Sequence, residues 1–157
     1  MVHGGGTLKD TEALKKVIKD LLASQNLAVI ATQKEGQPFA NLVAFAATDD
    51  LKHLVFATTR ATRKYARLMA DSRMCMMIDN RQNQASDFHN ATAIAAIGRA
   101  EEVRGTEKAD LMKLYLSKHS HLKAFATAPT CALMKLRVDR YDIVRRFQNV
   151  MELWMTQ

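Results

Sequence analysis

The chain of 157 residues has little cysteine and little proline, two of each, and three of its six glycines stand together at positions 4–6. Cys75 and Cys131 lie far apart without zinc-ligand spacing, which argues against a disulfide framework or a metal site; we expect buried free thiols. No apolar run approaches the roughly 20 residues of a membrane span, and the first residues carry no apolar signal core. We therefore expect a cytoplasmic protein without membrane contact.

The composition is that of a folded globular protein, with 48% hydrophobic and 25% charged residues and no biased tract. The length fits one domain over residues 1–157, in which the glycine-containing start, residues 1–7, is expected to be a flexible tail. The formal net charge of +7 favours anionic partners, whether nucleic acid, a membrane surface or a phosphorylated small molecule. Bulk charge alone does not choose among these.

Hydrophobic periodicity predicts a mainly β fold with flanking helices (α+β). An amphipathic helix that Thr7 can cap comes first, and Gly98 is a candidate bulge site in a later strand. The pattern predicts strands at 27–33, 39–47, 53–58, 73–79, 91–103, 131–138 and 141–155, helices at 61–71, at 106–117 and shortly before Pro129, and a loop at 80–90. Six or seven strands in this order suit a small, largely antiparallel barrel.

Two of these strands are apolar on both faces. Strand 39–47 carries apolar or small residues throughout, which is typical of a strand packed on two sides and could leave room for a flat ligand. The last strand, 141–155, is partly apolar on each side, and we expect it to be buried against both the barrel and a partner subunit.

The stretch FATTRATRK at 56–64 concentrates hydroxyls and cations where a strand ends and a helix is about to begin near Thr62. A helix start offers free backbone N–H groups and a partial positive charge, which together suit a phosphate. The threonine hydroxyls can add neutral donors, and Arg60, Arg63 and Lys64 can neutralise the dianion. One interpretation of this stretch is therefore a phosphate site.

A second interpretation needs no ligand. Thr62 would be an ordinary N-cap, and Arg60, Arg63, Lys64 and Arg67, at i, i+3, i+4 and i+7, would line a solvated helix face. The local chemistry leaves both interpretations open. Nucleic-acid binding is the weaker hypothesis, because the cationic stripe is short and has no interleaved aromatics, and we expect no nucleic-acid partner.

The remaining polar side chains form no recognisable catalytic site. His119 and His121 stand two apart on a helix and would point to different sides, so we expect a surface helix end rather than a metal pair. Asp87 and His89 are expected to belong to a polar loop rather than to a substrate pocket. No serine or cysteine stands with a neighbouring base, so hydrolytic catalysis has no support and catalytic residues stay unassigned.

The order of elements, with FATTRATRK and IDNR at 78–81 as the most specific parts, resembles the FMN-binding split β-barrel family typified by pyridoxamine 5'-phosphate oxidase. The resemblance spans residues 8–153. It implies an antiparallel split β-barrel and a homodimer with two FMN molecules at the subunit interface, the isoalloxazine ring lying against barrel strands. It also implies an oxidoreductase in which the flavin carries hydride or electrons to or from an unidentified small molecule.

The resemblance further implies which residues hold FMN. It places the ribityl phosphate on the 58–64 stretch and the flavin ring against the backbone of strand 39–47. It places residues at the end of strand 73–79 within reach of the flavin or the ribityl chain, and late residues close to the partner subunit's flavin. The phosphate group comprises Thr58, Thr59, Arg60, Thr62, Arg63 and Lys64, and the ring strand contributes Val43, Ala44 and Phe45. The residues after strand 73–79 are Asn80, Arg81 and Gln82, and the late residues are Gln148 and Trp154.

Two departures from the family pattern concern the reaction. Strand 39–47 is uncharged, whereas in the true oxidase it carries cations that serve cofactor and substrate. The chain also ends in QNVMELWMTQ, without the basic segment that helps to hold pyridoxal phosphate. FMN binding is therefore better supported than pyridoxamine phosphate oxidation, and the alternative hypothesis is a non-catalytic flavin or haem carrier or sensor on the same barrel.

Overall fold

The computed structural model describes residues 8–156, so the expected tail at 1–7 and the cap at Thr7 lie outside the described residues. The helices are α1 (Leu8–Ser24), α2 (Arg63–Ala70), α3 (Asp87–Asn90), α4 (Glu107–Lys118) and α5 (Lys123–Ala126), with a short 3-10 turn, η1 (Ser120–Leu122). The strands are β1 (Leu27–Lys34), β2 (Gln37–Ala47), β3 (His53–Thr59), β4 (Arg73–Asp79), β5 (Thr92–Glu102), β6 (Cys131–Arg145) and β7 (Asn149–Trp154).

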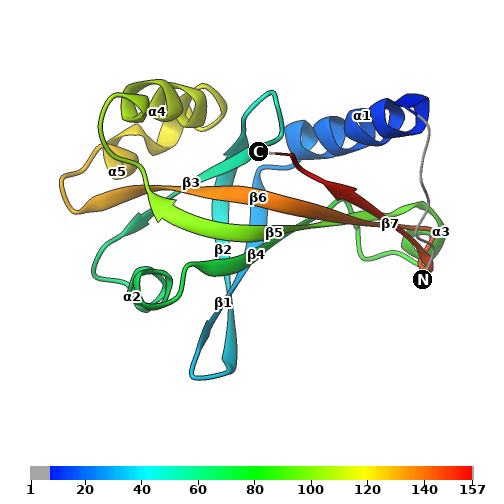
Figure 1. Cartoon of the computed structure of the whole chain (residues 1–157), viewed down its shortest axis with the longest axis horizontal. Coiled ribbons are helices and arrows are strands. Elements are labelled where there is room, and N and C mark those ends of the chain that lie inside the picture. Colours follow the sequence, from blue (N-terminus) through cyan, green and yellow to red (C-terminus); the bar gives the residue numbers. More distant parts are fainter. Residues whose placement is uncertain (1–7, 157) are drawn as a thin grey trace.

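The strands form one antiparallel sheet in the order β3-β2-β1-β4-β5-β6-β7. A further pairing of β3 with β6 closes the first six strands into a barrel, and β7 extends the sheet beyond the closure. Figure 1 shows α2, α4 and α5 at one end of the long β5 and β6 strands, and α3 with the start of β7 at the other. The predicted mainly β fold with flanking helices is confirmed.

The β1–β2 hairpin turns tightly within the sequence EGQP, residues 35–38. Lys34 pairs with Gln37, so Glu35 and Gly36 alone form the turn, with φ values of 51° and 81°. Two central residues with positive φ are the signature of a type I′ turn, whose twist matches the twist of the paired strands.

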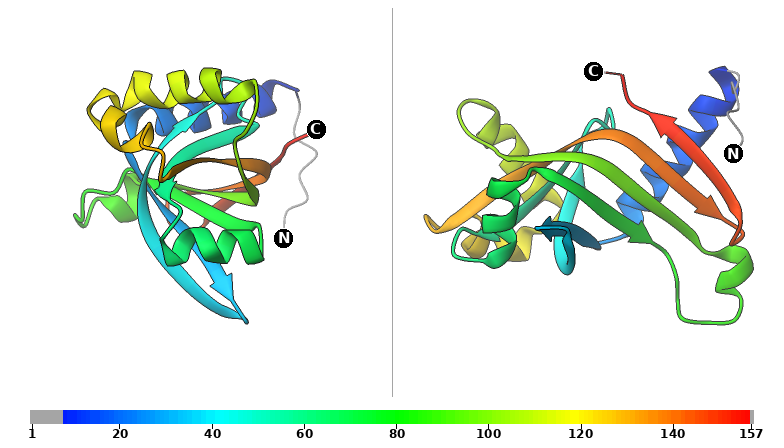
Figure 2. Two further views of the ribbon diagram at one scale, coloured as in Figure 1. Left: turned by 90° about the vertical axis from the view of Figure 1, so that its left-hand side faces the viewer. Right: turned by 60° about the horizontal axis from the view of Figure 1, so that its bottom comes forward.

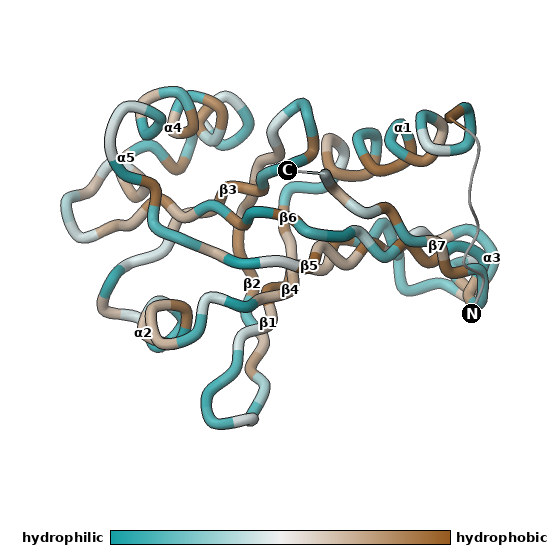
Figure 3. The backbone as a smooth tube through the Cα atoms, viewed as in Figure 1, coloured by the Kyte–Doolittle hydropathy of each residue, from teal (hydrophilic) through white to brown (hydrophobic). Residues whose placement is uncertain are grey.

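The barrel interior is filled by the inward residues of each strand. Along β1, buried positions alternate with half-buried ones, as expected for a sheet with one face on the core. Helix α1 closes one opening by burying Ile18, Leu21 and Leu22, and Figure 3 shows the matching alternation of hydrophobic and hydrophilic residues along it. Each such fully buried aliphatic side chain contributes about 1.5–3 kcal/mol to stability.

A second buried cluster lies on the outside of the barrel, under α4 and α5. Tyr115 of α4 and Ala126 of α5 pack over the outward residues of β3 and β6, among them Val55 and Leu133. Cys131 belongs to this cluster and is buried as predicted, whereas Cys75 is only half-buried because it points to a side of the barrel that no described helix covers.

Gly98 lies at the predicted bulge. The register between β5 and β6 shifts between Ile97 and Gly98. A Cβ atom at this position would lie 1.9 Å from the backbone oxygen of Arg137, so only glycine allows the two strands to approach this closely.

The predicted break between strands 131–138 and 141–155 is wrong. Strand β6 runs continuously from Cys131 to Arg145, and the chain turns at 146–148 into β7. Arg146 and Phe147 take φ values of 49° and 63°, and Phe147 is 65% exposed. Hydrophobic periodicity missed this turn because it contains no glycine, and because an apolar side chain occupies its tip.

Two smaller expectations also need correction. The predicted loop at 80–90 ends in the one-turn helix α3. Strand β2 is packed on both sides only in its second half, since residues 40–42 are exposed and Leu42 is 67% exposed. Among the described residues, no helix is long and apolar enough to cross a membrane.

Candidate functional site

The junction between β3 and α2 carries the predicted phosphate stretch. Thr62 is the N-cap of α2, because its Oγ1 accepts a 3.2 Å hydrogen bond from the Tyr65 N–H and donates one of 2.9 Å to the Thr59 carbonyl. Thr58 is 2% exposed, and its Oγ1 lies 3.1 Å from that of Thr62. These two hydroxyls therefore hold the junction together. Thr59, which stands between the two residues in the sequence, is half-buried.

Arg60 is engaged within the chain. Its Nε donates a 2.7 Å hydrogen bond to Oε1 of Glu102, and its Nη1 donates one of 2.8 Å to the carbonyl of Pro129. The Glu102 side chain is only 5% exposed and also pairs with Arg104. The hydrogen bond to Glu102 raises the pKa of Arg60 above its usual value. Arg60 thus ties the junction to β5 and to the start of β6.

Arg63 and Lys64 differ from Arg60 in having no side-chain hydrogen bond or ion pair with any described residue. Their backbone N–H groups are the first two of α2 and have no intrahelical acceptor. Lys64 is half-buried, and this burial lowers the pKa of its ammonium. The first turn of α2 therefore carries two cations without a partner among the described residues and two N–H groups without an intrahelical acceptor.

The cationic face of α2 is not wholly solvated. The guanidinium carbon of Arg67 lies 3.4 Å from the centroid of the Phe39 ring, a cation–π contact with β2. The N-cap at Thr62 is confirmed, and the remaining free cations keep the phosphate interpretation open.

Asn80, Arg81 and Gln82 are exposed and follow β4 at the opposite end of the barrel from this junction. Asn80 Oδ1 accepts a 2.8 Å hydrogen bond from the Thr92 N–H, and Arg81 Nε lies 3.3 Å from Asp79 Oδ1. Figures 1 and 2 show α2 and α3 at opposite ends of the sheet. Within one chain, therefore, residues 80–82 do not meet the 58–64 stretch.

The two late residues also lie away from the junction. Gln148 is exposed in the β6–β7 turn. Trp154 is 63% exposed on β7, and the Arg140 guanidinium lies 4.9 Å from its ring centroid. Asp87 and His89 lie in α3 rather than in the expected loop, and Asp87 accepts hydrogen bonds from two backbone N–H groups of the loop that precedes the helix.

A continuous outward surface of the barrel is not covered by any described helix. Strand registers place its members side by side across β2, β1, β4, β5 and β6, and neither buried cluster includes them. We call this surface the open face; it comprises Leu42, Leu27, Val29, Ala31, Cys75, Met77, Ala93, Ala95, Ile97, Arg140, Asp142 and Val144. Most of these side chains are apolar and half-buried, while Leu27 and Leu42 are 57% and 67% exposed.

The predicted ring-binding strand residues are divided between two sides. Val43 and Phe45 point into the barrel core, and Ala44 is half-buried on the outside. The carbonyl of Phe45 is taken by His119, whose Nε2 lies 2.7 Å from it. His119 is 2% exposed, so the expected surface position was wrong. Its helix end packs on β2, and burial lowers the pKa of the imidazole.

Lys118 joins α4 to α1. Its Nζ donates hydrogen bonds of 2.8 and 2.6 Å to the carbonyls of Leu22 and Gln25, and it lies 4.0 Å from the centroid of the Phe45 ring. Carbonyls at the end of a helix carry partial negative charge, so the cation caps α1 favourably. Burial nevertheless lowers the pKa of Lys118 to about 8.

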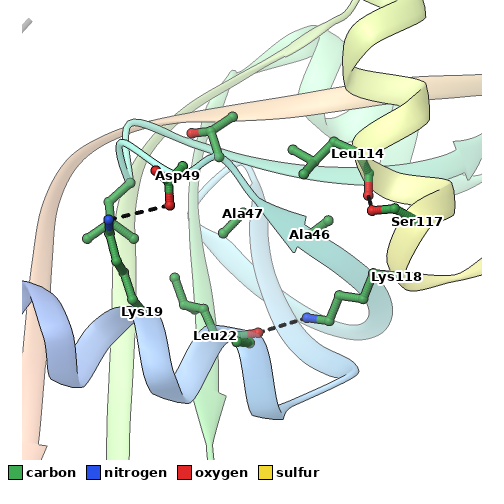
Figure 4. A pocket seen from close by; sticks show the side chains of 11 residues that line it. Lys19, Leu22, Ala46, Ala47, Asp49, Leu114, Ser117 and Lys118 are labelled. Carbon is green, nitrogen blue, oxygen red and sulfur yellow. Dashed lines mark hydrogen bonds and ion pairs between the residues drawn. The ribbon is translucent and has the colours of Figure 1, made fainter.

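A pocket of about 230 Å³ lies next to Lys118, between α1, the β2–β3 turn and α4. Figure 4 shows its apolar floor, which includes Leu22 and Ala46, and the Lys19–Asp49 pair at its side. The Lys118 ammonium is already bonded to two carbonyls and lies against the Phe45 ring. The pocket lies at the start of β3, whereas the 58–64 stretch lies at its end, so it is separate from the predicted phosphate site.

Sequence reasoning missed Glu102, Lys118 and the buried role of His119. Each contacts a partner far away in the chain, 42 residues for Glu102 and Arg60 and 74 for His119 and Phe45. Local spacing carries no signal for such pairs. No group of three or more His, Cys, Asp or Glu side chains among the described residues could hold a metal ion.

The closed six-stranded antiparallel barrel with flanking helices defines a split-barrel protein of the pyridoxamine 5'-phosphate oxidase type. The sequence profile described as pyridoxamine 5'-phosphate oxidase matches residues 14–145, and the chain belongs to this family. No curated protein matches the sequence.

Solved structures with the same fold have diverged far in sequence. A heme binding protein from Mycobacterium smegmatis superimposes with a TM-score of 0.80 at 20% identity, covering 89% of this chain but 57% of that protein. General Stress Protein 26 from Bacillus anthracis gives 0.70 at 19% identity, covering 90% and 98%. A FAD-binding protein from Mesorhizobium loti gives 0.64 at 15% identity, covering 80% and 89%. At these identities the likeness extends to the fold alone.

Proposed function

We propose that the protein is a homodimeric, FMN-binding flavoprotein that catalyses a redox reaction on a small molecule. The observation that carries this proposal is the start of α2, where Arg63 and Lys64 have no partner among the described residues. An unpaired, half-buried cation is costly unless an anion joins it, and a helix start is suited to a phosphate.

The residues present fit the phosphate of FMN in part. The side chains of Arg63 and Lys64 and the first N–H groups of α2 would hold it. Arg60, Thr58 and Thr62 would keep the junction in shape, because their polar atoms are already bonded within the chain. The fit therefore assigns charge neutralisation to two residues rather than to the whole 58–64 stretch.

The open face supports the homodimer. It joins apolar side chains of five strands, and it includes Leu27 and Leu42, which are mostly exposed in the single chain. Large exposed apolar surfaces of soluble proteins are mostly interaction sites, and a twofold pairing would bury the same face of both copies. One chain alone does not bring residues 80–82, Gln148 and Trp154 to its own junction, so in this proposal the partner subunit contributes them, as the family resemblance implies.

In this proposal a bound flavin supplies hydride or electron transfer. The chain's own residues bind and orient: Arg63 and Lys64 fix the phosphate, and β2 provides an uncharged strand for the ring. No cation stands at 39–47, so the substrate charge would have to be met elsewhere. This favours a substrate other than the phosphorylated amine of the true oxidase.

A haem-binding function on the same barrel is the second candidate. It is supported by the structural neighbour described as a heme binding protein, which has the highest TM-score of those compared above. The two candidates differ in colour, because haem gives a Soret band and FMN gives the two flavin bands. The absorption spectrum of the purified protein separates them directly.

The decisive experiment measures FMN and riboflavin binding to the double variant R63Q/K64Q. Loss of two charge-assisted contacts should weaken FMN binding by roughly tenfold or more. Riboflavin has no phosphate, so its affinity should stay unchanged. The control K113Q/K123Q removes the same net charge from exposed lysines without side-chain partners among the described residues and should bind FMN normally. Equal FMN affinity in both double variants would overturn the phosphate assignment.

A further inference from the structure

Three arginines stand side by side on the outside of the barrel. Arg73 of β4 is directly opposite Arg99 of β5, and Arg99 is directly opposite Arg137 of β6. Residues opposite each other in antiparallel strands point to the same face, and all three side chains are exposed. We call this group the arginine row. Like charges in directly opposite positions destabilise a sheet, so the row needs an explanation.

The β5–β6 bulge creates the row. Ile97 pairs with Arg140, and after the register shift Gly98 pairs with Val138 and Arg99 with Arg137. Without the shift, Arg99 would be opposite Val138, whose side chain is buried in the core. The glycine that permits the close approach of the strands therefore also brings two arginines together.

The counter-charges within the chain lie at the ends of the row. Arg73 Nη2 lies 2.6 Å from Asp71 Oδ2, and Arg137 Nε lies 4.0 Å from Asp139 Oδ1. Within residues 8–156, the one polar partner of the Arg99 side chain at the centre is a hydroxyl, Ser72 Oγ, 3.4 Å from its Nη1. No carboxylate among the described residues pairs with this central arginine.

The charged and titratable groups next to the row do not neutralise Arg99. Glu101 lies two residues beyond Arg99 on the same face, but Lys135 holds it at 3.1 Å. His53 is opposite Arg137 on β3, and burial lowers the pKa of its imidazole, so this end of the row gains no further charge at neutral pH. The row is therefore a local excess of positive charge centred on Arg99.

We propose that the arginine row binds a chain of two or three phosphates, free or carried by a nucleotide. Adjacent strands are about 4.8 Å apart, so the backbones of the outer two arginines lie about 10 Å apart. One phosphate can therefore contact two neighbouring arginines but not all three. Guanidinium groups bind phosphate oxygens in pairs of parallel hydrogen bonds, which suits successive phosphates.

This site is distinct from the flavin phosphate site proposed above. The segment from Asp71 to Arg73 follows the last turn of α2, whereas Arg63 and Lys64 lie in its first turn. The eight residues of α2 separate the two by about 12 Å of helix. The proposal for the row stands whether or not the protein binds FMN.

The test uses isothermal titration of the full-length protein with inorganic triphosphate, ATP and orthophosphate at matched ionic strength. The variant R99Q removes the central charge, and R145Q is the control, because Arg145 is exposed, has no side-chain partner among the described residues and lies at the far end of β6. Both variants lose one positive charge, and circular dichroism checks that both remain folded.

Triphosphate should bind the parent and R145Q alike, and R99Q should bind it roughly tenfold more weakly or worse. ATP binding as tight as triphosphate binding would identify a nucleotide as an equally good source of the phosphates, while weaker ATP binding would favour the free chain. The proposal is overturned if R99Q and R145Q bind triphosphate equally, or if orthophosphate binds as tightly as triphosphate.

Discussion

The Nε atom of Arg60 lies 2.7 Å from Oε1 of Glu102, a residue 42 positions later in the chain. This contact fixes the strand–helix junction to β5. Arg63 and Lys64 are then the cations of the stretch that have no partner in the described part of the chain. The hydrogen bond to Glu102 therefore gives Arg60 a structural role, which distinguishes it from Arg63 and Lys64, the two residues proposed to bind phosphate.

Replacing Glu102 by alanine should lower the free energy of unfolding by about 1–3 kcal/mol, because two arginines lose their shared, nearly buried acceptor. Urea denaturation measures the change. The matched control is Glu101→Ala, whose side chain is 65% exposed and which should change stability by less than about 0.5 kcal/mol. Equal effects of the two substitutions would show that Glu102 does not hold the junction.

Gly98→Ala should destabilise the fold by at least about 2 kcal/mol, since the new Cβ meets backbone rather than a movable side chain. Gly36→Ala is the comparison, because its Cβ would enter open space and only the positive φ of 81° opposes it, at a cost of about 1 kcal/mol. Chemical denaturation of both variants decides the point. A smaller loss at Gly98 than at Gly36 would contradict the close approach of β5 to β6.

Lys118 predicts a pH dependence of stability. Its pKa is about 8 in the fold, below the ordinary 10.5, so between these values the unfolded chain binds more protons than the folded one. The contribution of Lys118 to stability therefore rises with pH across this interval. Thermal unfolding of the parent and Lys118→Met, compared from pH 7.5 to 10, isolates it from other titrating groups.

The difference in stability, parent minus Lys118→Met, should increase steadily with pH. A difference that stays constant, or that falls as pH rises, would mean that the ammonium is not desolvated between α1 and α4.

Leu42→Glu should shift the proposed homodimer toward monomer, because it places a charge on the proposed apolar interface at a side chain that is 67% exposed in the single chain. Sedimentation velocity at several protein concentrations gives the mass. Met69→Glu, at a 48% exposed position of α2 outside the open face, is the control and should leave the mass unchanged. A parent protein that sediments as a monomer would refute the interface.

Arg99→Gln should raise the melting temperature by about 1–3 °C at low salt, because it removes two like-charge cross-strand pairs. The gain should shrink as salt is added, since the screening length falls to about 3 Å at 1 M. Scanning calorimetry with and without salt measures both effects. If the substitution lowers the melting temperature at low salt, the arginines do not repel one another.

Much of the fold follows from local patterns. The N-cap at Thr62 and the bulge at Gly98 were each predicted from residue type and position, because each depends on backbone conformation over a few residues. The β6–β7 turn was missed because Arg146 and Phe147 adopt positive φ, a conformation that is normally signalled by glycine or asparagine.

The candidate site was predictable only in part. The sequence pointed to a cluster of hydroxyls and cations at 58–64, and it could not tell which of them are already bonded. Glu102 and Pro129 reach Arg60 from other strands, and His119 reaches the Phe45 carbonyl from α4. Such pairings depend on how the strands are ordered in the barrel, which residue spacing does not encode.

The sequence by itself determined most of the elements and their order, because alternation, turn residues and caps act over short stretches of chain. The split-barrel family was indicated by a resemblance and shown by the matching profile. The tertiary structure alone decided which cations remain unpaired, which strand face stays uncovered and which arginines lie side by side. These properties arise from strand register and barrel closure, and both bring together residues that are distant in the sequence.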